Sequence, residues 1–379
     1  MADNTKIEWT DATWNPITGC SIVSPGCTNC YAMKLAGTRL KHHESRAGLT
    51  KESKGGPVWT GEVRFNEQWL TQPLEWSKPR MIFVCAHGDL FAEGVPDEWI
   101  DHVFAIMALA PQHTFQVLTK RPKRMREYLT RPRWRPVLDW GQDERPTYFI
   151  AEAAGKLAIR LPRNIKVPAH VRTFGQIAEF ERDIRDELLW PLPNVWLGVS
   201  VEDQKRADER IPILLDTPAA IRWISAEPLL GPLNVAEYFQ TIIYKPQSVG
   251  CSDSLLLSVI RSALDWVVAG GESGLGARPM HPDWARSIRD QCAAAGVPFL
   301  FKQWGAWTSI LDREADDPDW RADYSRSLSD VHEDIRWINL QGGTGFRGER
   351  FHVMRRTPRS VAGRLLDGVE HNAFPVTGR

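Results

Sequence analysis

Short apolar runs recur along this chain, and each ends in a polar or glycine-rich turn that precedes a helix-like segment. The runs are nearly continuous in hydrophobicity, as expected for strands that helices cover on both faces. They occupy Met81–Cys85, Thr114–Leu118, Val195–Val199, Ile221–Ile224, Trp266–Ala269 and Phe299–Phe301. Repeated β–α units close into a barrel or an open doubly wound sheet. With one more strand before Cys20, we expect a parallel α/β fold, a partial TIM-like barrel of the (β/α)6 type with insertions.

The spacing of apolar residues between the runs predicts helices, most clearly over Asp97–Leu109 and Pro282–Ala294. Three stretches lack this alternation of strand-like runs and helix-like segments, and we expect them to be insertions. They are residues 37–57, 131–193 and 236–264. The chain past residue 305 is charged and ends in a basic tail. We therefore predict a barrel domain over residues 1–305 and a C-terminal appendage over residues 306–379.

Composition limits the choice of partners. The 379 residues carry 47 basic and 47 acidic side chains, so no overall field attracts nucleic acid or an anionic membrane. No stretch approaches the roughly 20 apolar residues of a membrane span, and the first eight residues are polar. We expect a cytoplasmic protein with no membrane contact. Six cysteines over this length are too sparse for a disulfide scaffold.

Three of the six cysteines, Cys20, Cys27 and Cys30, lie within eleven positions in a C-x6-C-x2-C pattern. Three thiolates on one loop can hold three irons of a four-iron cluster, and the fourth iron then has an open position for a ligand. Zinc is the alternative. A structural zinc site needs four closed ligands, and the nearest additional candidates are His42 and His43. The other three cysteines, Cys85, Cys251 and Cys292, are scattered singly.

Polar residues follow the predicted strands. In a parallel barrel the carboxyl ends of all strands meet at one face, which carries the active site. Capping of the following helices is the ordinary alternative role for such residues. Among them we select Glu227, Glu272 and Lys302 as candidate catalytic residues. The full set is His87, Asp89, Thr119, Lys120, Ser200, Glu202, Asp203, Ser225, Glu227, Glu272, Ser273, Lys302 and Gln303.

The glycine-rich segment Gly270–Gly274 could be mistaken for a phosphate-binding loop. It lacks the Gly-Lys-Ser/Thr ending of a nucleoside-triphosphate loop and the spacing of a dinucleotide fingerprint. We interpret it as a turn that needs a close backbone approach, with Glu272 pointing inward.

Several unusual strings resemble an uncharacterised, phage-associated family that is described by its three-cysteine motif and regarded as radical S-adenosylmethionine (SAM)-like. They span most of the chain from residue 7 to residue 305 and touch its end. Besides Cys27 and Cys30, the matching strings are Thr13–Cys20, Gly88–Phe91, Leu118–Pro122, Gly198–Glu202, Ser225–Leu229, Gly270–Gly274, Phe301–Gly305 and Gly363–Gly368.

This resemblance implies a [4Fe–4S] cluster on the three cysteines, with SAM bound to its open iron through the amino and carboxylate groups. Reductive cleavage would then give a 5′-deoxyadenosyl radical. Tyr31 would lie close to the cluster or the adenine, and Asp89 would hold the amino group. Ser200 and Glu202 would also bind the cofactor.

The sequence departs from the usual radical SAM pattern at two places. The usual spacing is C-x3-C-x2-C, whereas the first gap here is six residues, so the loop must bulge. The methionine-binding Gly-Gly-Glu commonly follows the second strand, but here it follows a late strand, as Gly270–Glu272. The second strand is followed instead by His87, Gly88 and Asp89.

The expected function is thus an iron–sulfur enzyme that cleaves SAM to start radical chemistry on an unknown substrate. The phage association extends this expectation to nucleotides or nucleic acid. An electron donor such as flavodoxin or ferredoxin and a separately encoded protein partner would complete the system.

The alternative is a non-catalytic zinc or iron–sulfur module that binds nucleic acid. Its support is a run of eight basic residues between Lys120 and Arg135, with Trp134 among them. More often such a run is a solvated helix face. The carboxylates that follow the predicted strands argue against a phosphate-binding face.

Overall fold

The computed structural model describes most of the chain and divides it into two compact units. Unit 1 comprises residues 1–24, 30–199 and 216–222, and unit 2 comprises residues 25–29, 200–215 and 223–379. The described residues are 5–137, 140–160, 190–240, 242–244, 259–261, 263–311, 334–343 and 351–376.

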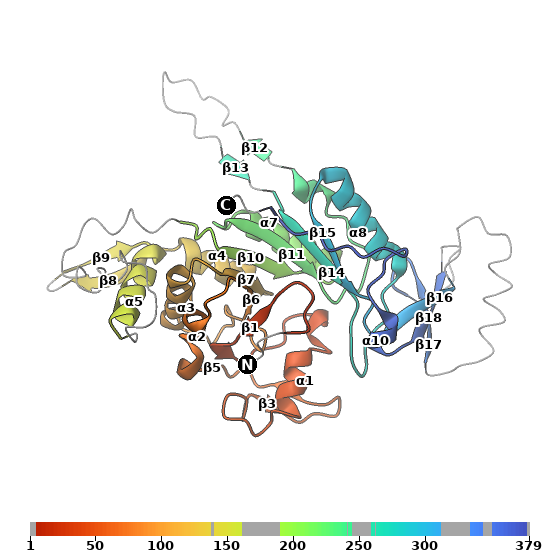
Figure 1. Cartoon of the computed structure of the whole chain (residues 1–379), viewed down its shortest axis with the longest axis horizontal. Helices are drawn as coiled ribbons and strands as arrows, with labels where there is room; N and C mark the ends of the chain where they lie inside the picture. Colours follow the sequence, from red (N-terminus) through yellow and green to blue (C-terminus); the bar gives the residue numbers. More distant parts are fainter. Residues whose placement is uncertain are drawn as a thin grey trace, which may run out of the picture. The chain divides into compact units, whose positions relative to one another are not determined.

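A parallel seven-stranded sheet forms the centre of the fold (Figure 1). Its order is β1, β6, β7, β10, β11, β14, β15. All six runs predicted from the sequence are strands of this sheet, and β1 supplies the strand expected before Cys20. The total is therefore seven rather than the six of the predicted barrel type. The strands are β1 (Ala12–Trp14), β6 (Met81–Val84), β7 (Thr114–Thr119), β10 (Val195–Ser200), β11 (Ile221–Ala226), β14 (Trp266–Gly270) and β15 (Phe299–Gln303).

In unit 1 the register of the parallel strands aligns one apolar row across four strands. Ala12 pairs with Ile82, Ile82 with Phe115, and Phe115 with Val195, and all four side chains are buried. Burying large apolar side chains stabilises a fold by about 1.5–3 kcal/mol each. This row accounts for one buried apolar position in each of the four strands.

The helices of unit 1 include the predicted Asp97–Leu109, which is found with the same bounds. Three short antiparallel pairs, β2 with β5, β3 with β4 and β8 with β9, complete the unit. The elements are α1 (Tyr31–Gly37), α2 (Gln72–Glu75), η2 (Glu67–Trp69), α3 (Asp97–Leu109), α4 (Pro122–Thr130), α5 (Pro146–Arg160), β2 (Ile17–Thr18), β3 (Thr50–Lys51), β4 (Val58–Trp59), β5 (Arg64–Phe65), β8 (Arg133–Val137) and β9 (Trp140–Glu144).

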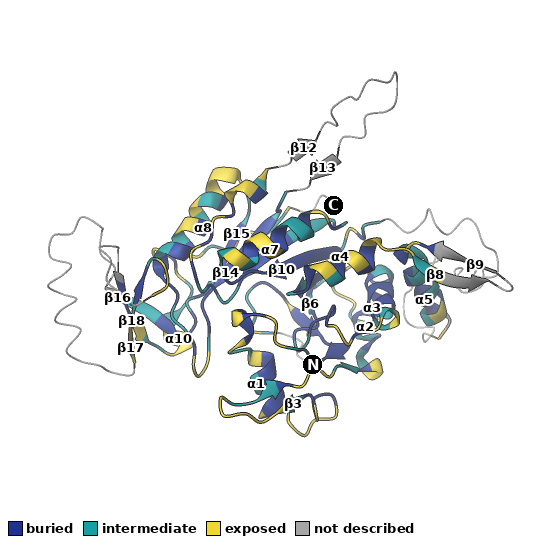
Figure 2. Ribbon diagram, turned by 180° about the vertical axis from the view of Figure 1, so that it is seen from behind, coloured by how far each residue is buried: buried dark blue, intermediate teal, exposed yellow. Residues whose placement is uncertain are grey.

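Unit 2 pairs β11, β14 and β15 in parallel and adds a three-stranded antiparallel sheet in the order β16, β18, β17. Helix α8 confirms the predicted helix at Pro282, and it ends at Gly296, whose φ of 67° suits a glycine. Figure 2 shows α8 with both exposed and buried residues. The other elements are η1 (Pro25–Cys27), α7 (Gln204–Leu215), η4 (Ala236–Phe239), β12 (Ile242–Tyr244), β13 (Val259–Arg261), α8 (Pro282–Ala295), β16 (Trp307–Leu311), β17 (Ile335–Asn339), β18 (Phe351–Arg356) and α10 (Arg359–Ala362).

The end of the chain returns to the sheet. Phe301 donates its backbone N–H to the carbonyl of His371 over 3.0 Å, and Ala373 donates to the carbonyl of Phe299 over 3.2 Å. The segment thus runs along β15 and belongs to the same unit as that strand.

None of the helices in the described ranges is long and apolar enough to cross a membrane.

Candidate functional site

Both ends of the cysteine loop attach to the residues that follow β6. At the first end, Gly19 donates its N–H to the carbonyl of His87 over 3.2 Å and pairs with Gly88 in a parallel bridge. At the second end, the Tyr31 hydroxyl donates to the carbonyl of Ala86 over 2.5 Å. The carboxyl end of one buried strand therefore fixes where the loop leaves the sheet and where it returns.

Gly19 is required at the first of these attachments. Its φ is +95°, and a Cβ there would lie 2.2 Å from the carbonyl oxygen of Glu62. Only glycine meets both conditions. Close backbone packing thus explains why a glycine precedes Cys20.

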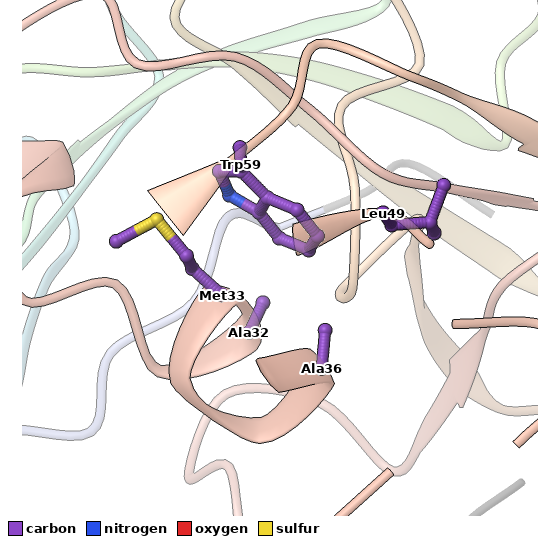
Figure 3. Packing of buried hydrophobic residues seen from close by; sticks show 5 residues of the cluster. All are labelled: Ala32, Met33, Ala36, Leu49 and Trp59. Carbon is purple, nitrogen blue, oxygen red and sulfur yellow. The ribbon is translucent and has the colours of Figure 1, made fainter. Parts of the chain in front are cut away.

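Cys20 and Cys30 pack against a small apolar cluster that α1 forms with the hairpin β3–β4 (Figure 3). Met33 of α1 and Trp59 of β4 belong to it, and Cys30 directly precedes α1. The complete cluster is Ala32, Met33, Ala36, Leu49 and Trp59. It gives the two thiols a firm apolar support on one side.

Arg121, which follows β7, is a charged contact of Cys20, whose thiol also donates to the carbonyl of Ser21 over 3.4 Å. Its Nη1 lies 3.5 Å from the Cys20 sulfur and 3.0 Å from an Asp89 oxygen, and its Nε lies 2.9 Å from Glu93. Its Nη2 donates to the carbonyl of Ser21 over 3.1 Å. Burial lowers the pKa of Arg121, but Asp89, Cys20 and Glu93 more than offset this, so its pKa lies above the ordinary value. Arg121 is a buried, permanent cation beside the first thiol.

Asp89 is the support of that cation. One carboxylate oxygen accepts from the N–H of Phe91 at 3.0 Å and from the Thr119 hydroxyl at 2.7 Å. The other accepts from the N–H of Lys120 at 3.2 Å and from Arg121. Asp89 therefore ties the end of β6 to the end of β7, and its predicted role toward an amino group stays a prediction.

In unit 2, Glu202 holds the turn that carries Cys27. Its carboxylate accepts from the N–H of Gly26 at 3.2 Å and pairs with Arg210 at 2.9 Å. Arg210 also donates to the carbonyl of Ser200 over 2.7 Å. The Glu202 side chain is 0% exposed, and both partners keep its charge compensated. Ser200 and Glu202 thus adjoin the loop through this network.

Glu272 holds the other side of the same turn. It accepts from the Asn29 side chain at 2.9 Å and from three N–H groups of Arg278, the shortest at 2.6 Å. Arg278 also donates to the carbonyl of Pro25 over 3.0 Å. Glu272 and Glu202 together position residues 25–29 within unit 2.

The glycine-rich segment after β14 is a close backbone crossing, as predicted. A Cβ at Gly271 would lie 2.0 Å from the carbonyl oxygen of Trp304, and one at Gly305 would lie 2.1 Å from that of Glu272. Ala306 donates its N–H to the same Glu272 carbonyl over 2.9 Å. The glycines let the ends of β14 and β15 cross and aim the Glu272 side chain.

Glu227 and Lys302 form an ion pair at the ends of β11 and β15. The Lys302 Nζ lies 3.0 Å from Glu227, and the Ser225 hydroxyl donates to the second carboxylate oxygen over 3.1 Å. Gly270 leaves room, because a Cβ there would lie 2.9 Å from the carboxylate. The side chains of Glu227 and Lys302 are 13% and 19% exposed, so solvent reaches the pair. The structure brings these two predicted residues together.

The basic run after β7 is largely neutralised within unit 1. Arg133 pairs with Asp101 at 2.7 Å, Arg131 with Glu127 at 3.3 Å, and Arg124 pairs with Asp97. Arg121 and Arg126 are also ion-paired, and the Arg135 side chain lies outside the described residues. Most of the arginines that suggested a phosphate contact are therefore paired with carboxylates of the same unit.

Two of the scattered cysteines are buried thiols. Burial raises the pKa of Cys85 and of Cys292 to about 12 in each case, so both stay protonated at neutral pH. Cys251 lies outside the described residues. These two thiols are packing residues.

Among the described residues, one group of three side chains places His, Asp, Glu or Cys ligand atoms within 4.8 Å of one another, namely His281, Asp283 and His352. The Nδ1 of His281 accepts the N–H of Asp283 at 3.1 Å and caps α8. In a neutral ring the proton then sits on Nε2, which has no lone pair left for a metal. Capping of α8 therefore accounts for the closeness of His281 and Asp283.

Sequence reasoning missed the arginines of the site. Arg121 lay inside a quoted string but was counted with the basic run, and Arg46 and Arg278 drew no attention. Arg121 and Arg46 contact Asp89 and His87, which are distant in sequence, whereas Arg278 pairs with Glu272 only six positions away. Of the three, only Arg121 had a signal in the sequence, its place directly after a strand.

A family model described as a protein of unknown function, DUF5131, matches residues 4–375. The chain belongs to this family. Comparison with curated proteins found no match, and neither did comparison with solved structures. The family description states no activity, so the function is argued from the residues.

Proposed function

We propose that this member of the DUF5131 family is a cytoplasmic iron–sulfur enzyme of the radical SAM type, built on a partial TIM-like barrel. Cys20, Cys27 and Cys30 would hold a [4Fe–4S] cluster. What supports this most is the anchoring of the cysteine loop at the carboxyl end of β6, with Arg121 donating to Cys20. That is the edge of a parallel sheet where active sites lie.

The donor set suits an iron–sulfur cluster better than zinc. A structural zinc ion needs four ligands from the protein, and the cysteine loop offers three thiols. Three thiolates suffice for a four-iron cluster, whose fourth iron keeps an open position for a ligand. None of the described cysteines is joined in a disulfide, as ligands require.

The surroundings of the loop also suit such a group. Arg121 supplies a charged hydrogen bond to one sulfur, and hydrogen bonds to cluster sulfurs set reduction potentials. Glu202 and Glu272 fix the turn of Cys27. Tyr31 leaves half of its surface exposed next to Cys30, where its ring can stack on an adenine.

When bound, a cluster of this kind supplies an electron to SAM and so starts radical chemistry. The chain's own residues would position the reactants and move protons. The paired Glu227 and Lys302 can accept and return a proton, since their ion pair is reached by solvent and Ser225 orients the carboxylate. We assign Ser200, Glu202 and Asp89 to support of the cofactor site.

We further propose that flavodoxin or ferredoxin supplies the electron and that a separately encoded protein works with this chain. A nucleotide or nucleic acid is proposed as substrate. Because most of the basic run is ion-paired, we rank a non-catalytic nucleic-acid module second.

The proposal is tested by anaerobic purification and reconstitution, followed by iron, sulfide and zinc analysis. About four irons and four sulfides per chain are expected. Cys20→Ala, Cys27→Ala and Cys30→Ala should each lose the cluster, whereas Cys292→Ala, which removes a buried packing thiol, should keep it. Equal iron content in all four variants would overturn the assignment of the ligands.

A further inference from the structure

Arg46 is a buried cation that no carboxylate of the described chain contacts. Its side chain contacts His87, which follows β6, and the residue is 4% exposed. The guanidinium donates to the carbonyl of Ser45 at 3.2 Å, to the Ser45 hydroxyl at 2.7 Å and to Nδ1 of His87 at 2.6 Å. All three acceptors are neutral. Buried charges in proteins are normally paired or bound to a ligand.

His87 adds a second donor at the same place. Burial and then the charge of Arg46 lower the pKa of His87 to about 4, so the ring is neutral. Because Nδ1 accepts from Arg46, the ring proton sits on Nε2. The described residues offer no hydrogen-bond acceptor to this N–H.

Arg64 places a second positive charge near Arg46. It donates to the carbonyls of Glu44 and of Ala47, the latter at 2.7 Å, and forms no ion pair with a described residue. The pKa of Arg46 is lowered to about 10, mainly by burial and in part by repulsion from the positive charge of Arg64. The nearby Cys85 thiol is protonated. Two cations and a neutral histidine thus gather with no negative side chain to balance them.

We propose that Arg46 and His87, with the charge of Arg64, bind an oxyanion, the carboxylate or phosphate group of a small molecule. The planar guanidinium fits the two oxygens of such a group. The backbone carbonyl of His87 also accepts the N–H of Gly19, so the site adjoins the first end of the cysteine loop. The inference needs no iron and stands beyond the proposed function.

The first test measures thermal unfolding of the full-length protein in chloride and in millimolar inorganic phosphate at equal ionic strength. Phosphate should raise the Tm of the wild type in a saturable way, because a ligand stabilises the state that binds it. Arg46→Gln should lose this rise, with affinity for phosphate reduced at least tenfold. Arg39→Gln, which removes an exposed arginine, should keep it.

The same variants separate binding from a merely structural role. Arg46→Gln removes a buried charge but also three hydrogen bonds and a contact with the Trp69 ring, so the readout is the difference in Tm between phosphate and chloride rather than the Tm in chloride itself. General stabilisation by phosphate acts on all variants alike. An equal phosphate response in Arg46→Gln and Arg39→Gln overturns the proposal, and so does an equal loss of Tm in both salts for Arg46→Gln.

A second arm distinguishes the two sources of the oxyanion. SAM carries a carboxylate, and 5′-methylthioadenosine does not. Suppression of the phosphate effect by SAM alone would identify the carboxylate as the occupant, and persistence at saturating SAM would identify a phosphate of another molecule. A protein that takes up no iron on anaerobic reconstitution but still binds phosphate through Arg46 would refute the proposed function and leave this inference standing.

Discussion

The guanidinium of Arg121 lies 3.5 Å from the sulfur of Cys20 and 3.0 Å from the carboxylate of Asp89, so one buried cation joins the cysteine loop to the ends of two strands. Both side chains of the ion pair are almost fully buried, 6% exposed for Arg121 and 7% for Asp89. The contribution of this ion pair to the free energy of unfolding should therefore be large enough to measure.

Arg121→Met should lower the free energy of unfolding by about 3–5 kcal/mol, because it leaves the Asp89 carboxylate buried without its cation. Asp89→Asn should be destabilising for the converse reason. In the double variant the two losses should not add, since neither charge remains. Urea unfolding of the four proteins measures this cycle. Additive losses would show that the two side chains stabilise the fold independently.

Gly271→Ala tests the backbone crossing that aims Glu272. The new Cβ would lie 2.0 Å from the Trp304 carbonyl oxygen, and backbone cannot swing aside as a side chain can. We expect a loss of about 3 kcal/mol, the upper end of ordinary overpacking. Gly55→Ala is the matched control, because its Cβ would have no atom closer than 4.0 Å. Chemical denaturation of both variants checks the difference, and equal stabilities would contradict the crossing.

The stability of the protein should fall as the pH is lowered from about 6.5 to 4. Burial, and then the charge of Arg46, lowers the pKa of His87 to about 4, whereas the unfolded value is about 6.5. In this window the unfolded chain binds a proton that the folded chain does not, so stability rises with pH and is lost on acidification. The contribution is about 3 kcal/mol.

His87→Gln retains an acceptor for Arg46 and should flatten this pH dependence. Unfolding free energies between pH 4.5 and 7, measured on chelator-treated protein, compare the two slopes without interference from acid-labile iron. Identical slopes would mean that His87 titrates normally in the folded state.

The sequence predicted more of the fold than of the site. Strands such as β14, buried at every position, leave an apolar run that can be recognised without knowing the partners. The strand expected before Cys20 is β1, which is only three residues long, so its pattern could not fix its position within that segment. The six runs and this strand give the seven strands observed, and only the (β/α)6 type counts one too few.

The site residues that sequence reasoning missed owe their roles to distant partners. Arg121 meets Asp89 across 32 positions, and Arg46 meets His87 across 41. A single sequence shows the charge of an arginine but not whether a carboxylate will balance it. Glu227, Glu272 and Lys302 could be selected because each directly follows a strand, where topology alone brings polar ends to one edge.

Electron paramagnetic resonance of the reduced, reconstituted protein, with and without SAM, tests the central claim most directly. The account predicts a four-iron cluster signal that SAM perturbs and that disappears in Cys20→Ala, Cys27→Ala and Cys30→Ala. One tightly held zinc per chain with no iron–sulfur signal after reconstitution would contradict it.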